Sequence, residues 1–448
     1  MSTESEKPER PLTREEVQVN LIVEAYQKEN IEVKAARDSE GNIEFLYQEA
    51  VILVRDTHLD RVRALLFGPE GGGQRTERGS QQRDERDDDE EPGPGFIEGA
   101  TLLSIRGSRF PLALDALRVI DREIGVGVAT PNHIFSVAPV THCPATEPEE
   151  VPINSLPDPG ACDRGGGGLL IYAPDSGLLA SAAAHPWLAG VTGQPDSLPP
   201  PDSNGVVMIP GYAGHGTFIA GVARGMAPVS AVHVPRDFNA AGAVSEAKLV
   251  NRLHRALRRG ADIISLSAGG FTRRDLPPLS FVSFWNRYRH YKGVVMVAAA
   301  GNNSNRQPFW PAAFPEVVGV GALAASWRDR AYFSNFGPWV DVYAPGEGLV
   351  NAFATGTYVC REPPNAGQVR RFHGMARWSG TSFATPLVSG LIAARASRTG
   401  ENGRQAADAL LAFARAQNIP GLGPVLRPCD TGDIETGRAC CGCCCGAR

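Results

Sequence analysis

The sequence predicts an α/β protein with a mostly parallel central sheet and helices on both faces, preceded by a small α+β module. Two observations carry the larger part of this prediction. Apolar strands alternate with amphipathic helices through the second half of the chain, and polar residues follow directly after several of these strands. A third observation separates the module: a shorter strand–helix pattern ends before residue 138, where a Pro- and Glu-rich stretch begins.

The clearest strand–helix unit begins at Ser245, a residue type favoured at helix N-caps. Apolar residues recur on one face of the helix that follows: Leu249, Val250, Leu253, Ala256 and Leu257. Gly260 ends this helix, and 261–266 is the next apolar strand. A helical segment at 281–292 and a strand at 294–298 repeat the scheme. Such alternation is typical of parallel sheets covered on both faces, where ligands bind beyond the carboxyl ends of the strands.

The N-terminal third is divided by composition. Residues 1–42 form a charged segment, and 43–137 are predicted as the α+β module. Its predicted elements are strands at 50–54, 100–105 and 133–137 and helices beginning after Asp56 or Thr57 and spanning 112–124. An insertion at 68–95 is rich in charged residues and glycine, and it is expected to be disordered because it cannot bury a core.

The remaining boundaries are a linker at 138–163, the main α/β domain at 164–420 and a Cys-rich tail at 421–448. Six of the nine cysteines lie in the last twenty residues: Cys429, Cys440, Cys441, Cys443, Cys444 and Cys445. Some spacings suit a metal, but a zinc site usually needs two pairs separated by a structured loop. A reactive thiol tail is therefore favoured, with a metal or redox role as the alternative.

Composition and charge narrow the partners. The 448-residue chain carries a formal net charge of −5, which argues against a nucleic-acid partner. Residues 1–12 lack a basic start followed by an apolar core, and no apolar run approaches the roughly 20 residues that span a bilayer. We therefore expect no membrane association and a cytoplasmic location, with secretion by a non-classical route as the alternative.

The segment Gly380–Pro386 places Ser382 just before the apolar run 387–394, which is predicted to be a buried helix. Pro386 is expected in the first turn of that helix, where a missing N–H costs nothing. A serine at a helix N-terminus lies among unpaired N–H groups that can stabilise an oxyanion. The alternative interpretation is a capped, tightly packed core helix.

Two motifs upstream favour the chemical interpretation. His215 lies between glycines at the start of a second small-residue helix, although a lone histidine is more often a core or surface residue. Asp175 ends an apolar strand, although it could simply close that strand as an Asx-turn residue. Pro174 cannot donate to a sheet ladder, so the ladder is expected to break there or to lack a partner. The rival aspartates Asp163 and Asp196 do not end apolar strands.

The order Asp175, His215, Ser382 resembles the catalytic triad of the subtilisin-like serine proteases, the subtilases. Further segments resemble motifs of that family: 185–188, 267–270, 299–302, 332–337 and 344–346. The resemblance covers about residues 160 to 400. It implies a subtilisin-like fold and a serine endopeptidase that works through an acyl-enzyme intermediate.

The resemblance also implies a role for each site residue. Ser382 would be the nucleophile, His215 the general base and acid, and Asp175 the residue that orients the imidazole. Asn302 would bind the oxyanion with the Ser382 N–H, although an asparagine after a strand is more often a turn residue. Two segments would bind substrate and flank the specificity pocket: Ser267, Ala268 and Gly269, and Ala299, Ala300 and Gly301. Their small residues suggest room for a sizeable apolar side chain. A neutral imidazole is needed, so rates should rise through roughly pH 6–8.

The expected partners are protein or peptide substrates and the chain's own N-terminal module. The module resembles the ferredoxin-like propeptide of many subtilases, so it would be an intramolecular inhibitor of a zymogen, with self-cleavage between Val137 and about Asp163. An unrelated interaction domain is the alternative. No cofactor is required for the chemistry and no metal ligand is proposed; structural calcium occurs in relatives, but no calcium loop is recognisable. The competing function is a catalytically silent peptide-binding protein on the same fold.

Overall fold

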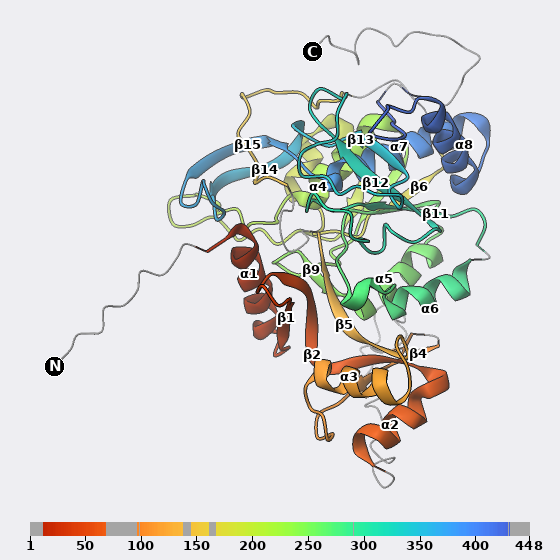
Figure 1. Cartoon of the computed structure of the whole chain (residues 1–448). Helices are drawn as coiled ribbons and strands as arrows, with labels where there is room; N and C mark the ends of the chain where they lie inside the picture. The colour runs from red at the N-terminus through yellow and green to blue at the C-terminus, as the bar shows by residue number, and fades with distance from the viewer. Residues whose placement is uncertain are drawn as a thin grey trace, which may run out of the picture.

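The computed structural model describes residues 12–68, 96–97, 99–137, 145–160, 167–289, 291–428 and 430. Figure 1 shows the N-terminal elements below a larger α/β body that contains the rest of the chain. Three predictions concern segments that lie wholly or mostly outside the described residues: the disordered insertion, the first part of the linker and the Cys-rich tail.

The larger body is built on a seven-stranded sheet in the order β13-β12-β11-β10-β6-β8-β7. Every pair in this sheet is parallel, which confirms the predicted α/β class. The strands are β6 (Leu170–Tyr172), β7 (Thr192–Gly193), β8 (Ala231–Val234), β10 (Ile263–Leu266), β11 (Val295–Ala299), β12 (Val317–Leu323) and β13 (Val342–Pro345). Strands β10 to β13 are buried along their whole length, as expected for a sheet covered on both faces.

Alternate residues of the strands separate two hydrophobic cores. In β11, Val295 and Val297 pack into one core, whereas Met296 and Ala298 pack into the other. The first core is covered by α4 (His215–Met226), α7 (Thr381–Thr399) and α8 (Gly403–Ala416). The second is covered by α5 (Glu246–Arg258) and α6 (Leu279–Tyr288). The sheet therefore has helices on both faces, as predicted.

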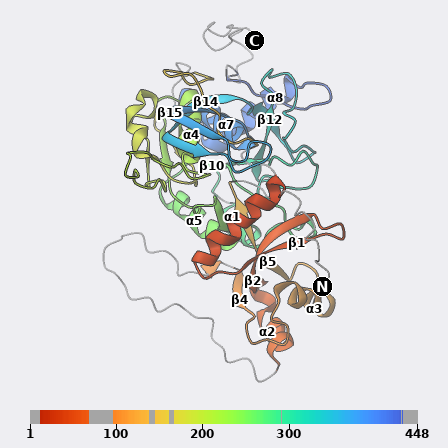
Figure 2. The same cartoon turned by 90° about the vertical axis from the view of Figure 1, so that its left-hand side faces the viewer.

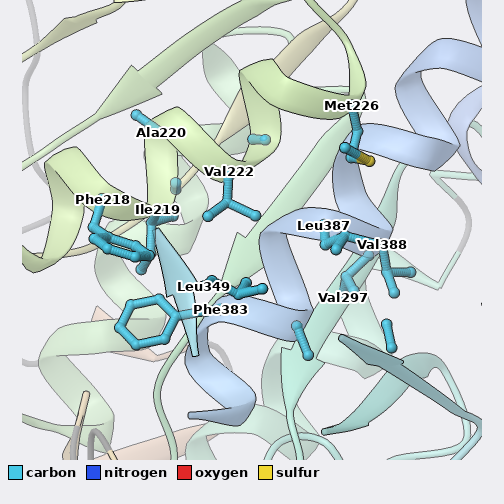
Figure 3. Packing of buried hydrophobic residues seen from close by; sticks show 14 of the residues in the cluster. Phe218, Ile219, Ala220, Val222, Met226, Val297, Leu349, Phe383, Leu387 and Val388 are labelled. Carbon is cyan, nitrogen blue, oxygen red and sulfur yellow. The ribbon is translucent and has the colours of Figure 1, made fainter. Parts of the chain in front are cut away.

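Helices α4 and α7 pack directly against each other, and Figure 3 shows Phe218 and Val222 of α4 on the same side of the sheet as Phe383 and Leu387 of α7. At Gly390, a Cβ atom would lie 2.6 Å from the carbonyl oxygen of Ala223. The two backbones therefore touch at this crossing. Close contact holds the N-termini of the two helices, which carry His215 and Ser382, in a fixed relation.

The N-terminal module is a sheet in the order β3-β4-β2-β5-β9, with β1 added to β2. Its strands are β1 (Val33–Arg37), β2 (Ile43–Arg55), β3 (Phe96–Ile97), β4 (Ala100–Ser104) and β5 (Ala129–Ser136), whereas β9 (Ala243–Ser245) comes from the main body. Its helices are α1 (Arg14–Lys28), α2 (Leu59–Phe67) and α3 (Ala113–Glu123). Strand β5 pairs antiparallel with β9, so the last strand of the module continues into the larger body.

The module begins earlier in the chain than the boundary that we predicted at residue 43. Helix α1 opens with a capping box formed by Thr13 and Glu16, and β1 pairs antiparallel with β2. Figure 2 shows α1 lying across the junction between the module and the main body. A salt bridge from Arg14 to Glu362 fixes its first turn there.

The remaining elements of the described residues are an antiparallel hairpin of β14 (Leu349–Val359) and β15 (Val369–Trp378) and four short 3₁₀ helices. The 3₁₀ helices are η1 (Asp56–His58), η3 (Ala180–Ala184), η4 (Pro186–Leu188) and η5 (Arg273–Asp275). The chain after the module lies along β15, because Glu149 and Arg377 exchange backbone hydrogen bonds of 2.8 and 2.9 Å. In the parts of the chain that the structure describes, no helix has both the length and the apolar composition needed to cross a bilayer.

The structure corrects the expected position of Pro386 and answers the question raised by Pro174. Pro386 is the sixth residue of α7, so it lies beyond the first turn where we had placed it. Pro174 follows the end of β6, whose pairing with β10 stops at Tyr172. The flanking N–H groups of Ala173 and Asp175 both donate to the β8 side, at 2.9 and 3.2 Å. The N–H that Pro174 lacks is therefore not needed by either ladder.

Candidate active site

Asp175 and His215 are joined by a direct hydrogen bond. Asp175 follows β6 at the carboxyl edge of the sheet, and His215 is the first residue of α4. The imidazole Nδ1 lies 2.8 and 3.0 Å from the two carboxylate oxygens, and both side chains are at most 1 % exposed. Because a carboxylate only accepts, Nδ1 carries a proton, and in the neutral imidazole Nε2 then holds the lone pair. Nε2 is buried and has no hydrogen-bond partner among the described residues.

The turn that carries His215 needs a glycine on its N-terminal side. Gly214 caps α4 with φ of +86°, in the left-handed region that glycine tolerates best. Aromatic rings hold the imidazole from the other side: Trp378 meets it edge-on at 5.6 Å and Phe383 lies at 5.3 Å between ring centroids. Phe383 directly follows Ser382, so the first turn of α7 packs against the imidazole.

Ser382 is the second residue of α7 and is 1 % exposed. Its hydroxyl lies 3.4 Å from the carbonyl oxygen of Val137 and 3.5 Å from that of Ser267. The hydroxyl thus faces both the end of the N-terminal module and the segment that we predicted to bind substrate. Its own carbonyl oxygen accepts a 2.7 Å hydrogen bond from the Ser267 hydroxyl.

The side-chain amide of Asn302 is oriented by the start of α7. Its oxygen accepts hydrogen bonds from the N–H and the hydroxyl of Thr381, both at 2.9 Å. This assignment leaves Nδ2 as a buried donor with no partner among the described residues. A Cβ placed on Gly380 would lie 3.7 Å from Nδ2 and 3.6 Å from the Ser382 N. The Asn302 Nδ2 and the Ser382 N therefore lie close to the same position, and the backbone N of Ala145 lies 3.5 Å from it.

The two predicted substrate-binding segments differ in their backbone hydrogen bonds. Gly269 pairs with Ser136 through two antiparallel hydrogen bonds of 3.0 and 3.1 Å, so 267–269 binds an extended chain in this structure. Ala299 and Ala300 continue β11 and are buried, and the Ala300 N–H is bonded to Val320. Gly301 donates its N–H to the hydroxyl of Thr381, at 3.1 Å.

The carboxylate of Asp196, which we had set aside as a rival, belongs to the same network. Its Oδ2 accepts hydrogen bonds from the Gly214 N–H at 2.7 Å and from the Ser176 hydroxyl at 2.9 Å. Ser176 in turn accepts from the Gly216 N–H at 3.1 Å and donates its own N–H to Asp175 at 2.7 Å. Burial raises the pKa of Asp196, and the neighbouring charge of Asp175 adds to the rise.

Sequence reasoning missed this role because Asp196 lies in a loop and belongs to none of the recognised motifs. The only available signal was its short distance in sequence from the glycine-flanked histidine. Among the described residues, the structure groups no three or more His, Cys, Asp or Glu side chains in a way that could hold a metal ion.

Comparison with known proteins assigns the family. The model of the subtilase family, Peptidase_S8, matches residues 177–416, a range that includes His215 and Ser382 and begins two residues after Asp175. Thermitase from Thermoactinomyces vulgaris is 32% identical over 275 residues, which cover 58% of this chain and 84% of that protein. A thermophilic serine proteinase from Bacillus sp. (strain AK1) is 35% identical over 201 residues, 42% of this chain and only 44% of that protein.

Among solved structures, fervidolysin from Fervidobacterium pennivorans, a keratinolytic enzyme related to subtilisin, matches with a TM-score of 0.53 at 17% identity. The match covers 85% of this chain and 60% of that one, so it extends into the N-terminal module and supports the fold. The family model covers more than half of the chain, and the parallel sheet and the module agree with it. The chain belongs to the subtilase family.

Proposed function

We propose that this chain is a serine endopeptidase that hydrolyses peptide bonds through Asp175, His215 and Ser382. One observation carries the proposal: a buried imidazole is fixed by a carboxylate at Nδ1, and its basic Nε2 has no partner among the described residues. The first turn of α7, which presents Ser382 among helix N-terminal N–H groups, packs against that imidazole. An unpaired, buried Nε2 does not help to stabilise the fold, whereas a general base needs such a nitrogen to accept a proton.

The proposed steps follow from these positions. Ser382 Oγ attacks the substrate carbonyl carbon while His215 Nε2 accepts the hydroxyl proton. The Asn302 Nδ2 and the Ser382 N–H hold the oxyanion, and one such donor is worth about 10²–10³ in rate. Collapse of the tetrahedral intermediate breaks the C–N bond, and His215 gives its proton to the leaving amine. Water then enters by the same base catalysis and releases the acid. Asp175 stabilises the imidazolium in both halves of the reaction, acylation and deacylation.

Self-processing is part of the proposal, and the position of the module supports it. The end of β5 lies between β9 and Gly269 as an added strand, which is how an extended substrate binds a sheet edge. The Val137 carbonyl oxygen then lies 3.4 Å from the Ser382 hydroxyl. Downstream, Thr146 accepts a 2.7 Å hydrogen bond from the Trp378 indole, so this part of the chain is held on β15. We therefore propose that the cleaved bond lies between Val137 and Ala145, in the first part of the range expected from the sequence.

The same contacts support a role for the module as an intramolecular inhibitor. A buried hydrogen bond of 2.7 Å between His133 Nδ1 and Glu246 ties β5 to the start of α5. An ion pair joins Asp121 of α3 to Arg273 at 2.8 Å. As long as the module stays bound, its last strand occupies the edge of 267–269 that a substrate would use.

The competing function, a silent peptide-binding protein, drew its support from Pro174. The hydrogen bonds on either side of Pro174 are intact, so Pro174 no longer supports it. Hydrolysis of a denatured protein substrate separates the two functions. The wild type should cleave it, and Ser382→Ala should be inactive and remain a single uncut chain.

The matched control is Ser389→Ala, because Ser389 is another fully buried serine of α7, seven residues further along. This control should stay active. Equal turnover by Ser382→Ala would refute the nucleophile, and a folded wild type that binds peptides but never cleaves them would favour the silent alternative.

A further inference from the structure

The ring of Phe309 lies between the two segments that we propose to bind substrate. Phe309 is fully buried. A Cβ placed on Gly269 would lie 2.5 Å from Cε1 of Phe309, and one placed on Gly301 would lie 3.0 Å from its Cγ. The segments that contain Gly269 and Gly301 are the two walls of the predicted specificity pocket. The aromatic ring therefore fills space that the small residues of both segments leave open.

Backbone pairing fixes which substrate side chain would meet this ring. An extended chain pairs with Gly269, as Ser136 does here. Ser382 Oγ lies 3.5 Å from the carbonyl oxygen of Ser267, two residues back along the same segment. In an antiparallel pair, the substrate residue opposite Ser267 is two residues beyond the one that pairs with Gly269. The attacked carbonyl therefore belongs to the residue opposite Ser267.

The position of the proposed oxyanion donors indicates which segment lies on the other side of that substrate residue. Asn302 directly follows the segment 299–301 in the chain. A substrate residue whose carbonyl oxygen binds to Asn302 Nδ2 therefore lies between 267–269 and 299–301. The side chain before the scissile bond then enters the gap between these segments. Phe309 lies at that gap, in contact with both.

The ring is held in place and is not free to swing away. Trp310 exchanges two backbone hydrogen bonds with Gly270, at 2.9 and 3.0 Å, so the loop is tied to the same strand that would bind substrate. The Phe309 carbonyl accepts a 2.9 Å hydrogen bond from the Ala313 N–H. Phe271 packs edge-on against the Phe309 ring at 5.3 Å between centroids.

We propose that Phe309 closes the base of the primary specificity pocket, so that this peptidase cleaves after residues with small side chains such as alanine, glycine or serine. The inference rests on the proposed function and adds its substrate class. It differs from the sequence expectation, in which the small residues of the two segments left room for a sizeable apolar side chain. A large side chain would have to displace a ring that is packed and tethered, and packed cores resist added volume.

The test uses quenched fluorescent peptides that differ only in the residue before the scissile bond, with alanine, valine, leucine or phenylalanine there. The processed wild type should favour alanine over phenylalanine in kcat/KM by on the order of 100-fold. Phe309→Gly should shift that ratio strongly toward phenylalanine, and Phe309→Leu should shift it part of the way. The Leu variant, which changes less volume, keeps the test valid if the Gly variant does not fold.

Phe314→Leu is the matched control. Phe314 follows in the same loop, but it packs on Trp310 at 4.6 Å and on Phe281 at 6.2 Å between ring centroids, in the core beneath α5 and α6. The ratio of kcat/KM for the alanine and phenylalanine peptides should be the same in Phe314→Leu as in the wild type. An active wild type that cleaves the alanine and phenylalanine peptides equally, or Phe309 variants with an unchanged ratio, would overturn this inference alone. A folded wild type that neither processes itself nor cleaves a peptide of any kind would overturn the proposed function as well.

Discussion

The hydroxyl of Ser267 donates a 2.7 Å hydrogen bond to the carbonyl oxygen of Ser382. In a regular helix this carbonyl would accept from the N–H four residues later, but that residue is Pro386, which has none. A side chain from the end of β10 therefore supplies the donor that the helix lacks. The bond also ties the substrate-binding segment to the turn that carries the proposed nucleophile.

Ser267→Ala should destabilise the protein, because it leaves a buried carbonyl oxygen without its donor. The expected loss is about 1–3 kcal/mol in the free energy of unfolding, measured by denaturant titration. Activity should fall as well, since the turn of Ser382 loses its link to β10. Thr385→Val is the control: the buried Thr385 hydroxyl contacts the carbonyl oxygen of Thr381 at 2.9 Å, and that oxygen also has a helical N–H to accept from, so its loss should be smaller. Equal losses in the two variants would contradict this account.

The parts of the site that sequence could predict are those carried by local motifs. Asp175, His215 and Asn302 each stand at the end of a strand or the start of a helix, and the structure places them there. Pro386 was expected in the first turn of α7, because the sequence does not show that Ser267 supplies a donor deeper in the helix. That bond joins residues 115 apart in the chain.

What sequence could not predict depends on distant packing. The sequence suggested only a short helix near 21–26, and the full length of α1 was not predicted because its buried face is short, with Val19, Ile22 and Tyr26 as its apolar members. The role of Asp196 depends on how a loop folds back on Gly214. Phe309 lies outside the recognised motifs, seven residues after Asn302, and the pairing of Trp310 with Gly270 brings it to the site.

Asp196→Asn should lower the catalytic rate. Asp196 holds both the Ser176 hydroxyl and the N-terminus of α4, and a small misplacement of reacting groups can cost on the order of 10- to 100-fold in kcat. Because burial raises the pKa of Asp196, its carboxylate should be protonated at a higher pH than that of an exposed aspartate. The advantage of the wild type over Asp196→Asn should therefore be full above that pKa and shrink as the pH falls through it. Profiles of kcat against pH for the two proteins measure this.

Asp202→Asn is the control for that experiment. Asp202 accepts hydrogen bonds from the N–H groups of Asn204 and Val206, within its own exposed turn. This variant should give the wild-type profile. If Asp196→Asn had the wild-type rate at every pH, the carboxylate would have no part in positioning the site.

Cys360 should be unreactive in the folded protein. Burial raises the pKa of its thiol to about 11, and the nearby carboxylate of Glu147 adds to the rise. At pH 8 only about one thousandth of the thiol would be ionised, and the thiolate is the reactive form. Iodoacetamide at pH 8, followed by peptide mapping, should modify Cys360 only after unfolding. Comparable modification of native and unfolded protein would show that the thiol is exposed or activated.

Labelling by a fluorophosphonate probe tests most directly whether His215 activates Ser382 as a nucleophile. Each protein, whether processed or uncut, is treated with the probe and digested, and the modified residue is located by mass spectrometry. The account predicts a single label on Ser382 in the wild type, none in Ser382→Ala, and a labelling rate reduced by several orders of magnitude in His215→Ala. A label on a different residue, or equal labelling rates in the wild type and His215→Ala, would contradict it.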